Sequence, residues 1–270
     1  MRILVAIKQV PETSKVKMDP ETGTMKRAGL EAIINPLDLY ALETALRLKD
    51  NHGATITVIT MGPPKADKAL REAVAMGCDD AVLLSDRRFG GADTWATAYT
   101  LVQGIKKLGR FDLILCGERA TDGDTGQVGP SMAALLDLNL ATYVSKCCWM
   151  QDGRLRVERL VEEGRQILAM PTPALLTVIK EIGSPRLPTL RGMKRARKLD
   201  IPVWHPEDIE ADLHRLGLNG SPTRVVKIAN PKVTRQTETV TAVTSEEMDI
   251  AAKRFWSYVE ENNLMGGNHD

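Results

Sequence analysis

Residues 121–130 read Thr121-Asp-Gly-Asp-Thr-Gly-Gln-Val-Gly-Pro130, and this stretch joins a strand pattern to a helix pattern. The apolar run at residues 111–116 precedes it, and residues 131–138 follow it with helical spacing. Three glycines at such a junction let the backbone approach a ligand closely. Free N–H groups at the start of the helix then face an anion, which the helix dipole favours. The stretch predicts a phosphate or pyrophosphate site, with an ordinary Gly/Asp turn as the alternative.

The two acids of this loop need a separate explanation. The loop contains neither the Gly-Lys-Ser/Thr of a Walker loop nor the GxGxxG fingerprint of dinucleotide folds. Asp122 and Asp124 would repel a phosphate that they faced. We therefore expect them to point at ribose hydroxyls or to cap the helix, while backbone N–H groups hold the phosphates.

Outward from this loop, strand and helix patterns alternate along the chain. Apolar strand patterns occur at residues 2–8, 54–60, 80–85 and 111–116. Asn35-Pro36 opens one intervening helix, because Asn is a good N-cap and Pro suits the first helical position. Asp93 or Thr94 caps another helix. The alternation predicts an α/β fold with a doubly wound, mostly parallel, Rossmann-like sheet of the adenine-nucleotide-binding type.

Ligands of such sheets bind beyond the carboxyl ends of the strands. The segments that follow the strands here are residues 9–11, 61–64 and 121–130, and Asn35 begins a helix after a crossover. We expect these segments to converge on one nucleotide.

The second half of the chain has a different pattern. Strands are expected at residues 143–150, 154–161 and 174–180, and residues 16–29 have the turn signals of a surface hairpin. We divide the chain into a nucleotide-binding α/β domain (1–182), a basic segment (183–200) and a carboxyl-terminal arm with a helix (201–270). Residues 186–198 hold six basic side chains and no acid. This segment is either a solvated helix face or a docking surface with apolar anchors at Leu187, Leu190 and Met193.

The composition of the chain argues against several classes of function. The net charge of +1 over 270 residues gives no sign of a nucleic-acid or membrane partner. No apolar run approaches the ~18 residues of a membrane span, so no membrane insertion is expected. The chain begins directly as a strand without a signal peptide, which favours a cytoplasmic location. The four cysteines and four histidines lack metal-ligand spacing, so we expect no metal site. We name no catalytic residue.

Several ordered motifs together identify a family resemblance. The motifs are residues 5–11 (Val-Ala-Ile-Lys-Gln-Val-Pro), 35–43 (Asn-Pro-Leu-Asp-Leu-Tyr-Ala-Leu-Glu), 58–63, 117–130 and 190–194. Along almost its whole length the chain resembles the β subunit of electron-transfer flavoproteins. The resemblance implies an αβ heterodimer, a nucleotide-binding fold, a recognition loop that docks a dehydrogenase, and a carboxyl-terminal arm that contacts the α subunit.

Carried over by position, the resemblance implies a set of nucleotide-binding residues. They are Ala6, Lys8, Asn35, Pro36, Leu37, Asp38, Met61, Thr94, Cys116, Thr121, Asp122, Gly123, Asp124, Thr125, Gly126, Gln127, Val128, Gly129 and Pro130. Leu190 falls where the recognition loop presents a leucine, with Lys194 and Arg197 beside it.

The family has two branches, and the resemblance favours one of them. Ordinary members hold AMP in the β subunit and carry a bulkier, more acidic loop, whereas electron-bifurcating members hold a second FAD. Residues 122–129 and 89–95 look like the bifurcating version, in which Thr94 reaches the isoalloxazine ring unless it serves only as a helix cap.

The bifurcating resemblance implies a sequence of electron transfers. FAD in this subunit takes hydride from NADH. One electron goes to the α-subunit FAD and a flavin dehydrogenase of the acyl-CoA or lactate type, and the other to ferredoxin or flavodoxin. An AMP-holding carrier and a non-redox adenine-nucleotide-binding module remain as alternatives.

Overall fold

The computed structural model of the 270-residue chain describes residues 1–12, 17–18, 25–26, 32–224, 239–262 and 264. The chain forms two compact units, Met1–Ile228 and Ala229–Asp270. The first unit contains the sheet and the candidate site.

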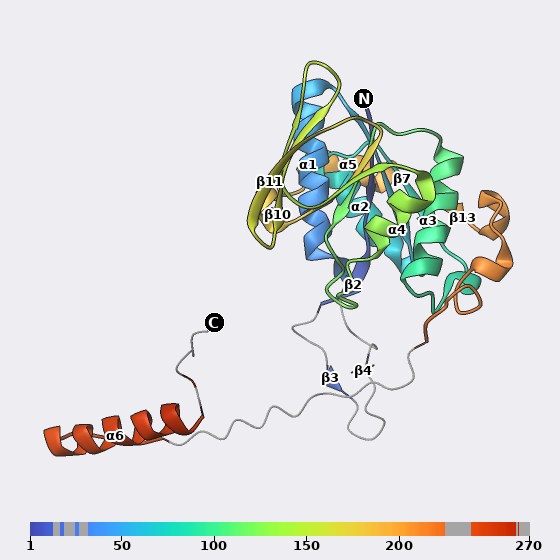
Figure 1. Cartoon of the computed structure of the whole chain (residues 1–270). Coiled ribbons are helices and arrows are strands. Elements are labelled where there is room, and N and C mark those ends of the chain that lie inside the picture. The colour runs from blue at the N-terminus through green and yellow to red at the C-terminus, as the bar shows by residue number, and fades with distance from the viewer. Residues whose placement is uncertain (13–16, 19–24, 27–31, 225–238, 263, 265–270) are drawn as a thin grey trace. The chain divides into compact units, whose positions relative to one another are not determined.

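A nine-stranded sheet runs through the first unit (Figure 1). Its spatial order is β11 (Gly164–Met170), β10 (Leu155–Val161), β9 (Asn139–Trp149), β12 (Ala174–Val178), β8 (Leu113–Gly117), β1 (Arg2–Ala6), β6 (Thr55–Met61), β7 (Asp80–Leu84) and β13 (Val203–Trp204). The strands from β9 to β13 pair in parallel, and β10 pairs antiparallel with β9 and β11. The predicted doubly wound, mostly parallel sheet is confirmed.

Helices cover both faces of this sheet (Figure 1). One face packs against α1 (Pro36–His52), α2 (Asp67–Met76) and α5 (Leu190–Lys198). The other face packs against α3 (Thr94–Leu108) and α4 (Val128–Leu136). Ile3, Leu4 and Val5 of β1 are completely buried between the two layers. A continuous apolar run is the pattern expected of such a parallel strand, because both of its faces lie in the core.

Local sequence sets the ends of these helices. Pro36 occupies the first turn of α1, and Gly53 ends that helix with φ of 68°. This left-handed conformation costs glycine nothing, since it has no Cβ. The Asp93 carboxylate caps α3 by accepting hydrogen bonds from two backbone N–H groups of its first turn. The helix that the sequence predicts from residue 131 begins earlier, at Val128.

Two short antiparallel ladders lie outside the main sheet. β2 (Gln9–Pro11) pairs with β5 (Ala32–Ile34), which brings the segment after β1 beside the start of α1. β3 (Lys17–Met18) pairs with β4 (Met25–Lys26) inside the predicted hairpin at residues 16–29. The remainder of that hairpin lies outside the described residues.

The structure differs from the sequence-based prediction in two further ways. β11 was not predicted, because this edge strand is largely exposed and lacks an alternating apolar pattern. The first compact unit also extends past residues 182 and 200, where the sequence suggested boundaries. It does so because β13 pairs with β7, while Ile209 and Leu216 are buried in the core beside α3. The division of residues 1–182, 183–200 and 201–270 by function stays a prediction.

The described part of the second unit contains α6 (Ser245–Glu261), which is the helix expected in the carboxyl-terminal arm. Thr244 and Glu247 form a capping box at its start. None of its residues is buried, and Met248 and Phe255 are among its exposed apolar side chains. Of the helices among the described residues, none combines the length and the apolar character that crossing a membrane requires.

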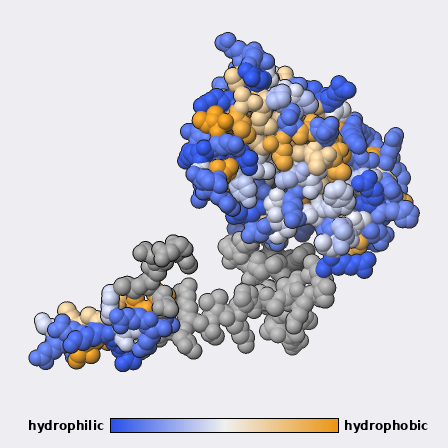
Figure 2. Space-filling model, viewed as in Figure 1, coloured by the Kyte–Doolittle hydropathy of each residue, from blue (hydrophilic) through white to orange (hydrophobic). Residues whose placement is uncertain are grey.

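The surface of the first unit is mixed in character. Figure 2 shows apolar residues gathered among charged ones on the side that carries β10 and β11. Leu140, Tyr143 and Ile167 are exposed apolar side chains of β9 and β11.

Candidate functional site

A cavity of about 590 Å³ opens at the carboxyl ends of β1 and β8. The chain builds the sheet outward from β1 through β6 to β7, then crosses back so that β8 pairs with the other edge of β1. The order of strands therefore reverses between β1 and β8. Open α/β sheets bind ligands at such a switch point, and the cavity volume lies within the roughly 300–1,000 Å³ of ligand pockets.

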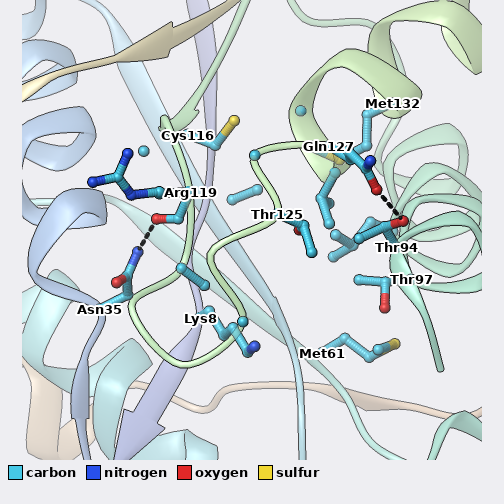
Figure 3. A pocket seen from close by; sticks show the side chains of 18 of the residues that line it. Lys8, Asn35, Met61, Thr94, Thr97, Cys116, Arg119, Thr125, Gln127 and Met132 are labelled. Carbon is cyan, nitrogen blue, oxygen red and sulfur yellow. Dashed lines mark hydrogen bonds between the residues drawn. The ribbon is translucent and has the colours of Figure 1, made fainter. Parts of the chain in front are cut away.

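Most of the predicted nucleotide-binding residues line this cavity (Figure 3). They are Ala6, Lys8, Asn35, Asp38, Met61, Thr94, Cys116, Gly123, Thr125, Gly126, Gln127, Val128 and Gly129. Six others adjoin them in the chain without lining the cavity, namely Pro36, Leu37, Thr121, Asp122, Asp124 and Pro130.

Other lining residues were not among the predicted set. They are Ile7, Phe89, Gly91, Ala92, Asp93, Thr97, Leu101, Gly117, Glu118, Arg119, Ala120, Met132 and Thr223. Thr97 was accessible to sequence reasoning, because it lies three residues after Thr94 on the same helix and so shares its face. Thr223 had no such signal, since it lies far along the chain from every motif.

The start of α4 offers a row of unpaired backbone donors. No side chain caps this helix, and among the described residues no acceptor pairs with the backbone N–H groups of residues 125–129. Gly126 has φ of 64°, a left-handed conformation that favours glycine. Pro130 fits in the first turn, where its missing N–H costs no helix bond. These donors suit an anion such as a phosphate.

The expectation that Asp122 or Asp124 caps α4 is wrong. The N-cap position falls on Gln127, three residues beyond Asp124. Both carboxylates pair with cations instead: Asp122 Oδ1 lies 2.6 Å from Lys8 Nζ, and Asp124 Oδ1 lies 2.7 Å from Arg119 Nε. These ion pairs offset the negative charge that would otherwise oppose an anion beside the loop.

Asn35 precedes α1 as predicted, but its side chain has another role. It makes no capping hydrogen bond. Its Nδ2 donates to Arg119 O at 2.9 Å (Figure 3). Its Oδ1 accepts from Thr121 N at 3.2 Å. The buried amide of Asn35 thus ties the glycine loop to the start of α1.

Asp38 joins the ends of the two central strands. Its Oδ2 accepts from Lys8 N at 2.8 Å, and its Oδ1 accepts from Gly117 N at 3.0 Å. Burial raises the pKa of Asp38 to about 7, against the opposing effect of these two N–H donors. A Cβ at Gly117 would stand 2.6 Å from Asp38 Oδ1, so only glycine allows this contact. Asp38 also lines the cavity, and its side chain forms part of the cavity floor.

The wall beneath α4 is closely packed. A Cβ at Gly129 would stand 2.7 Å from Thr177 Cγ2 and 2.9 Å from Cys116 Sγ. Burial raises the pKa of the Cys116 thiol, as does the nearby Asp38 carboxylate, so this side chain stays uncharged in the wall. Glycine at this position lets the first turn of α4 lie directly against β8 and β12.

Thr94 lies at the start of α3 without capping it. Asp93 Oδ1 accepts from Trp95 N and Ala96 N, each at 3.0 Å, and so supplies the cap. The hydroxyl of Thr94 donates instead to Gln127 Oε1 at 3.0 Å (Figure 3). This bond bridges the starts of α3 and α4 beside the cavity.

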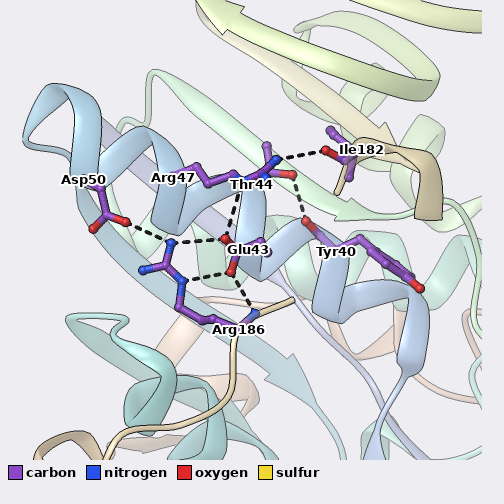
Figure 4. Close-up of polar contacts among 7 residues, drawn as sticks. All are labelled: Tyr40, Glu43, Thr44, Arg47, Asp50, Ile182 and Arg186. Carbon is purple, nitrogen blue, oxygen red and sulfur yellow. Dashed lines mark hydrogen bonds and ion pairs between the residues drawn. The ribbon is translucent and has the colours of Figure 1, made fainter. Parts of the chain in front are cut away.

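The basic segment that contains α5 is firmly attached to the fold (Figure 4). Arg186 donates to the buried Glu43 carboxylate from its backbone N at 3.0 Å and from Nε at 2.9 Å, and its Nη2 reaches Asp50 Oδ2 at 2.8 Å. Arg195 donates to the carbonyl oxygens of Cys78 and Asp79. Two of the six basic side chains therefore hold the segment in place.

Several other side chains of this segment face outward. Leu187 and Leu190 are each 84% exposed, although their backbone is held by the contacts around Arg186 and α5. Lys194 and Arg197 are also exposed on α5. Exposed leucines on a fixed backbone suit docking, because little ordering entropy is lost on binding.

Comparisons with known proteins show the family to which this chain is related. Residues 22–209 match the model of the electron transfer flavoprotein domain. An electron transfer flavoprotein subunit beta from Thermoanaerobacterium thermosaccharolyticum is 46% identical over 94% of this chain and 98% of its own length. The CarD subunit of the caffeyl-CoA reductase-Etf complex from Acetobacterium woodii is 47% identical over 92% and 95%. The acryloyl-CoA reductase electron transfer subunit gamma from Anaerotignum propionicum is 44% identical over 86% and 89%. The chain belongs to the electron transfer flavoprotein family, and it resembles the β subunit of that family.

Proposed function

We propose that this chain binds FAD in the cavity between β1 and β8 and acts as the β subunit of an electron-bifurcating electron transfer flavoprotein. The extent of the cavity on both sides of the glycine loop carries the proposal. In Figure 3, Asn35 and Arg119 lie on one side of Thr125, and Thr94, Thr97 and Met132 lie on the other. A mononucleotide needs one of these sides, whereas a dinucleotide with its diphosphate at the loop needs both.

The chemistry of each side supports a dinucleotide with its adenosine on the Asn35 side of the loop and its flavin ring on the Thr94 side. The unpaired N–H groups of residues 125–129 suit the diphosphate. The polar side, with Lys8, Asn35 and Arg119, suits a ribose and adenine. On the other side, Met61, Phe89 and Leu101 offer apolar surface for a flavin ring, and the Thr94 hydroxyl supplies a hydrogen-bonding group.

The cofactor would supply the redox chemistry. When bound, FAD would supply the chemistry for taking a hydride from NADH and for passing the two electrons on singly, one toward the α-subunit FAD and a dehydrogenase and the other to ferredoxin or flavodoxin. The residues of this chain bind and orient: the loop amides hold the diphosphate, Asp38 fixes the strand ends beneath it, and the Thr94–Gln127 bond fixes the ring side. Gly117 and Gly129 keep the backbone close enough for these contacts.

The exposed face of α5 supports docking of a dehydrogenase. Leu190 would enter an apolar pocket on the partner, and Lys194 and Arg197 would meet acidic groups at its rim. Two relatives are named as subunits that serve caffeyl-CoA reductase and acryloyl-CoA reductase, which supports an acyl-CoA-type partner here.

Counting the cofactors tests the proposal. The chain is purified together with its α subunit, the heterodimer is denatured, and the released nucleotides are separated and quantified. Two FAD per heterodimer are expected. One FAD and one AMP would instead assign the chain to the ordinary, AMP-holding branch. A colourless homodimer purified without any α subunit would favour the non-redox adenine-nucleotide-binding module.

A further inference from the structure

Residues 217–223 fold back onto the cavity from a distant part of the chain. Thr223 lines the cavity together with Gly91, Ala92 and Asp93 of the segment before α3. This contact joins positions that are 130 residues apart. The segment ends one residue before the last described residue of this stretch, Arg224.

A single carboxylate holds this segment. Asp93 Oδ2 accepts from Thr223 N at 3.0 Å and from Thr223 Oγ1 at 2.8 Å. The backbone N of Asp93 donates to Ser221 Oγ at 2.9 Å, and Ser221 Oγ donates to Gly217 O at 2.6 Å. Hydrogen bonds to an ionised acceptor are stronger than neutral ones, so Asp93 is the main polar attachment.

Close packing supplements these bonds. Gly91 has φ of 71°, and a Cβ there would lie 2.6 Å from Leu218 Cγ. Gly217 has φ of 51°, and its Cα faces the backbone oxygens of Arg88 and Gly90 too closely for a side chain. Glycines on both partners thus let residues 217–223 lie directly on residues 88–91. The two segments pack this closely because the glycine on each side lacks the Cβ that would otherwise hold them apart.

The same carboxylate also determines the start of α3. Asp93 Oδ1 caps the helix through Trp95 N and Ala96 N, while Oδ2 binds Thr223. Thr94 and Thr97 of that helix line the cavity. One side chain therefore orders two neighbouring parts of the cavity wall.

We propose that residues 217–223, anchored by Asp93, form one wall of the nucleotide pocket, and that nucleotide binding and the attachment of this wall to Asp93 strengthen each other. A ligand that touches Thr223 binds better when the wall is attached, and linkage requires that the bound ligand favour attachment by the same factor. The inference rests on the proposed function, because its ligand is the FAD proposed above. Pocket occupancy then controls how firmly the chain is held just before Arg224.

Binding measurements on variants test the coupling. Heterodimer stripped of nucleotide is titrated with FAD, and bound FAD is measured by equilibrium dialysis. Thr223→Val removes one hydrogen bond to a carboxylate and should weaken FAD binding by about five- to tenfold. Asp93→Ser keeps an N-cap oxygen but loses the second carboxylate oxygen, so it should weaken binding at least as much. Thr100→Val is the matched control, because that hydroxyl bonds only within α3 to Ala96 O and does not line the cavity.

Trypsin supplies an independent readout at Arg224. FAD should slow cleavage after Arg224 several-fold in the wild-type heterodimer and less in Thr223→Val, as quantified by mass spectrometry of the fragment that ends there. Equal FAD affinity in Thr223→Val and Thr100→Val, or cleavage unaffected by bound FAD, overturns the coupling between nucleotide binding and attachment of this wall. A wild-type heterodimer that takes up no FAD at all overturns the proposed function, and with it this inference.

Discussion

Substitutions of Gly126 test the role of the glycine loop, and the size of their effect can be estimated from the backbone conformation. Its backbone has φ of 64°, and a Cβ added there would meet only Glu118 O, at 3.4 Å. An alanine at this position therefore has room, and its cost is conformational. The left-handed region costs an L-residue about 1–2 kcal/mol relative to glycine.

The conformational cost of the alanine should weaken the binding of FAD. The loop is anchored at Asn35 but is otherwise accessible, so an alanine at position 126 can relax it into a different conformation when the pocket is empty. Binding must then restore the left-handed turn, and about 1–2 kcal/mol corresponds to roughly 5- to 30-fold weaker binding. Asparagine tolerates this conformation better than alanine, and a β-branched valine tolerates it worst.

A titration of stripped heterodimer with FAD checks the order of affinities. We expect wild type to bind most tightly, followed by Gly126→Asn, Gly126→Ala and Gly126→Val. The thermal unfolding midpoint of each variant separates loop strain from general instability. Equal affinities across all four proteins would refute the claim that the backbone of this loop holds the diphosphate.

Three further predictions concern the docking segment and the cavity floor. Leu190→Ala should slow electron transfer to a partner dehydrogenase with flavin content unchanged, and stopped-flow traces identical to wild type would remove α5 from the docking account. Arg186→Ala leaves the buried Glu43 carboxylate with fewer donors and should lower the free energy of unfolding by about 1–3 kcal/mol, whereas Arg186→Lys should lower it less. Because the pKa of Asp38 is raised to about 7, the folded protein binds more protons than the unfolded chain between pH 4 and 7. The stability of wild type relative to Asp38→Asn should therefore fall as the pH rises through that range, and a constant difference in urea denaturation would contradict the assignment.

The parts of the fold that sequence reasoning recovers are those set by local patterns. The apolar runs of β1 and β8 lie in the core because both sides of a central parallel strand are covered. Gly53 and Asp93 end and begin helices through their own backbone and side-chain chemistry. The glycine loop lies at the cavity because it follows a strand at the switch point, and the loops after the strands at that point surround the ligand site.

The parts that sequence reasoning misses depend on contacts between distant residues. Asn35 binds the loop 84 positions away instead of capping its helix, and Asp122 pairs with Lys8 across 114 positions. No local sequence pattern predicts either of these partners. β11 was missed because an exposed edge strand needs few apolar residues, and Thr223 because its place depends on Asp93.

The most direct measurement is a crystal structure of the heterodimer with its cofactors bound. The account predicts a diphosphate within hydrogen-bond distance of the backbone N–H groups of residues 126–129, with a flavin ring beside Thr94 and Thr97. Density for AMP alone beside Asn35, with the Thr94 side of the cavity closed by protein side chains, would contradict the account.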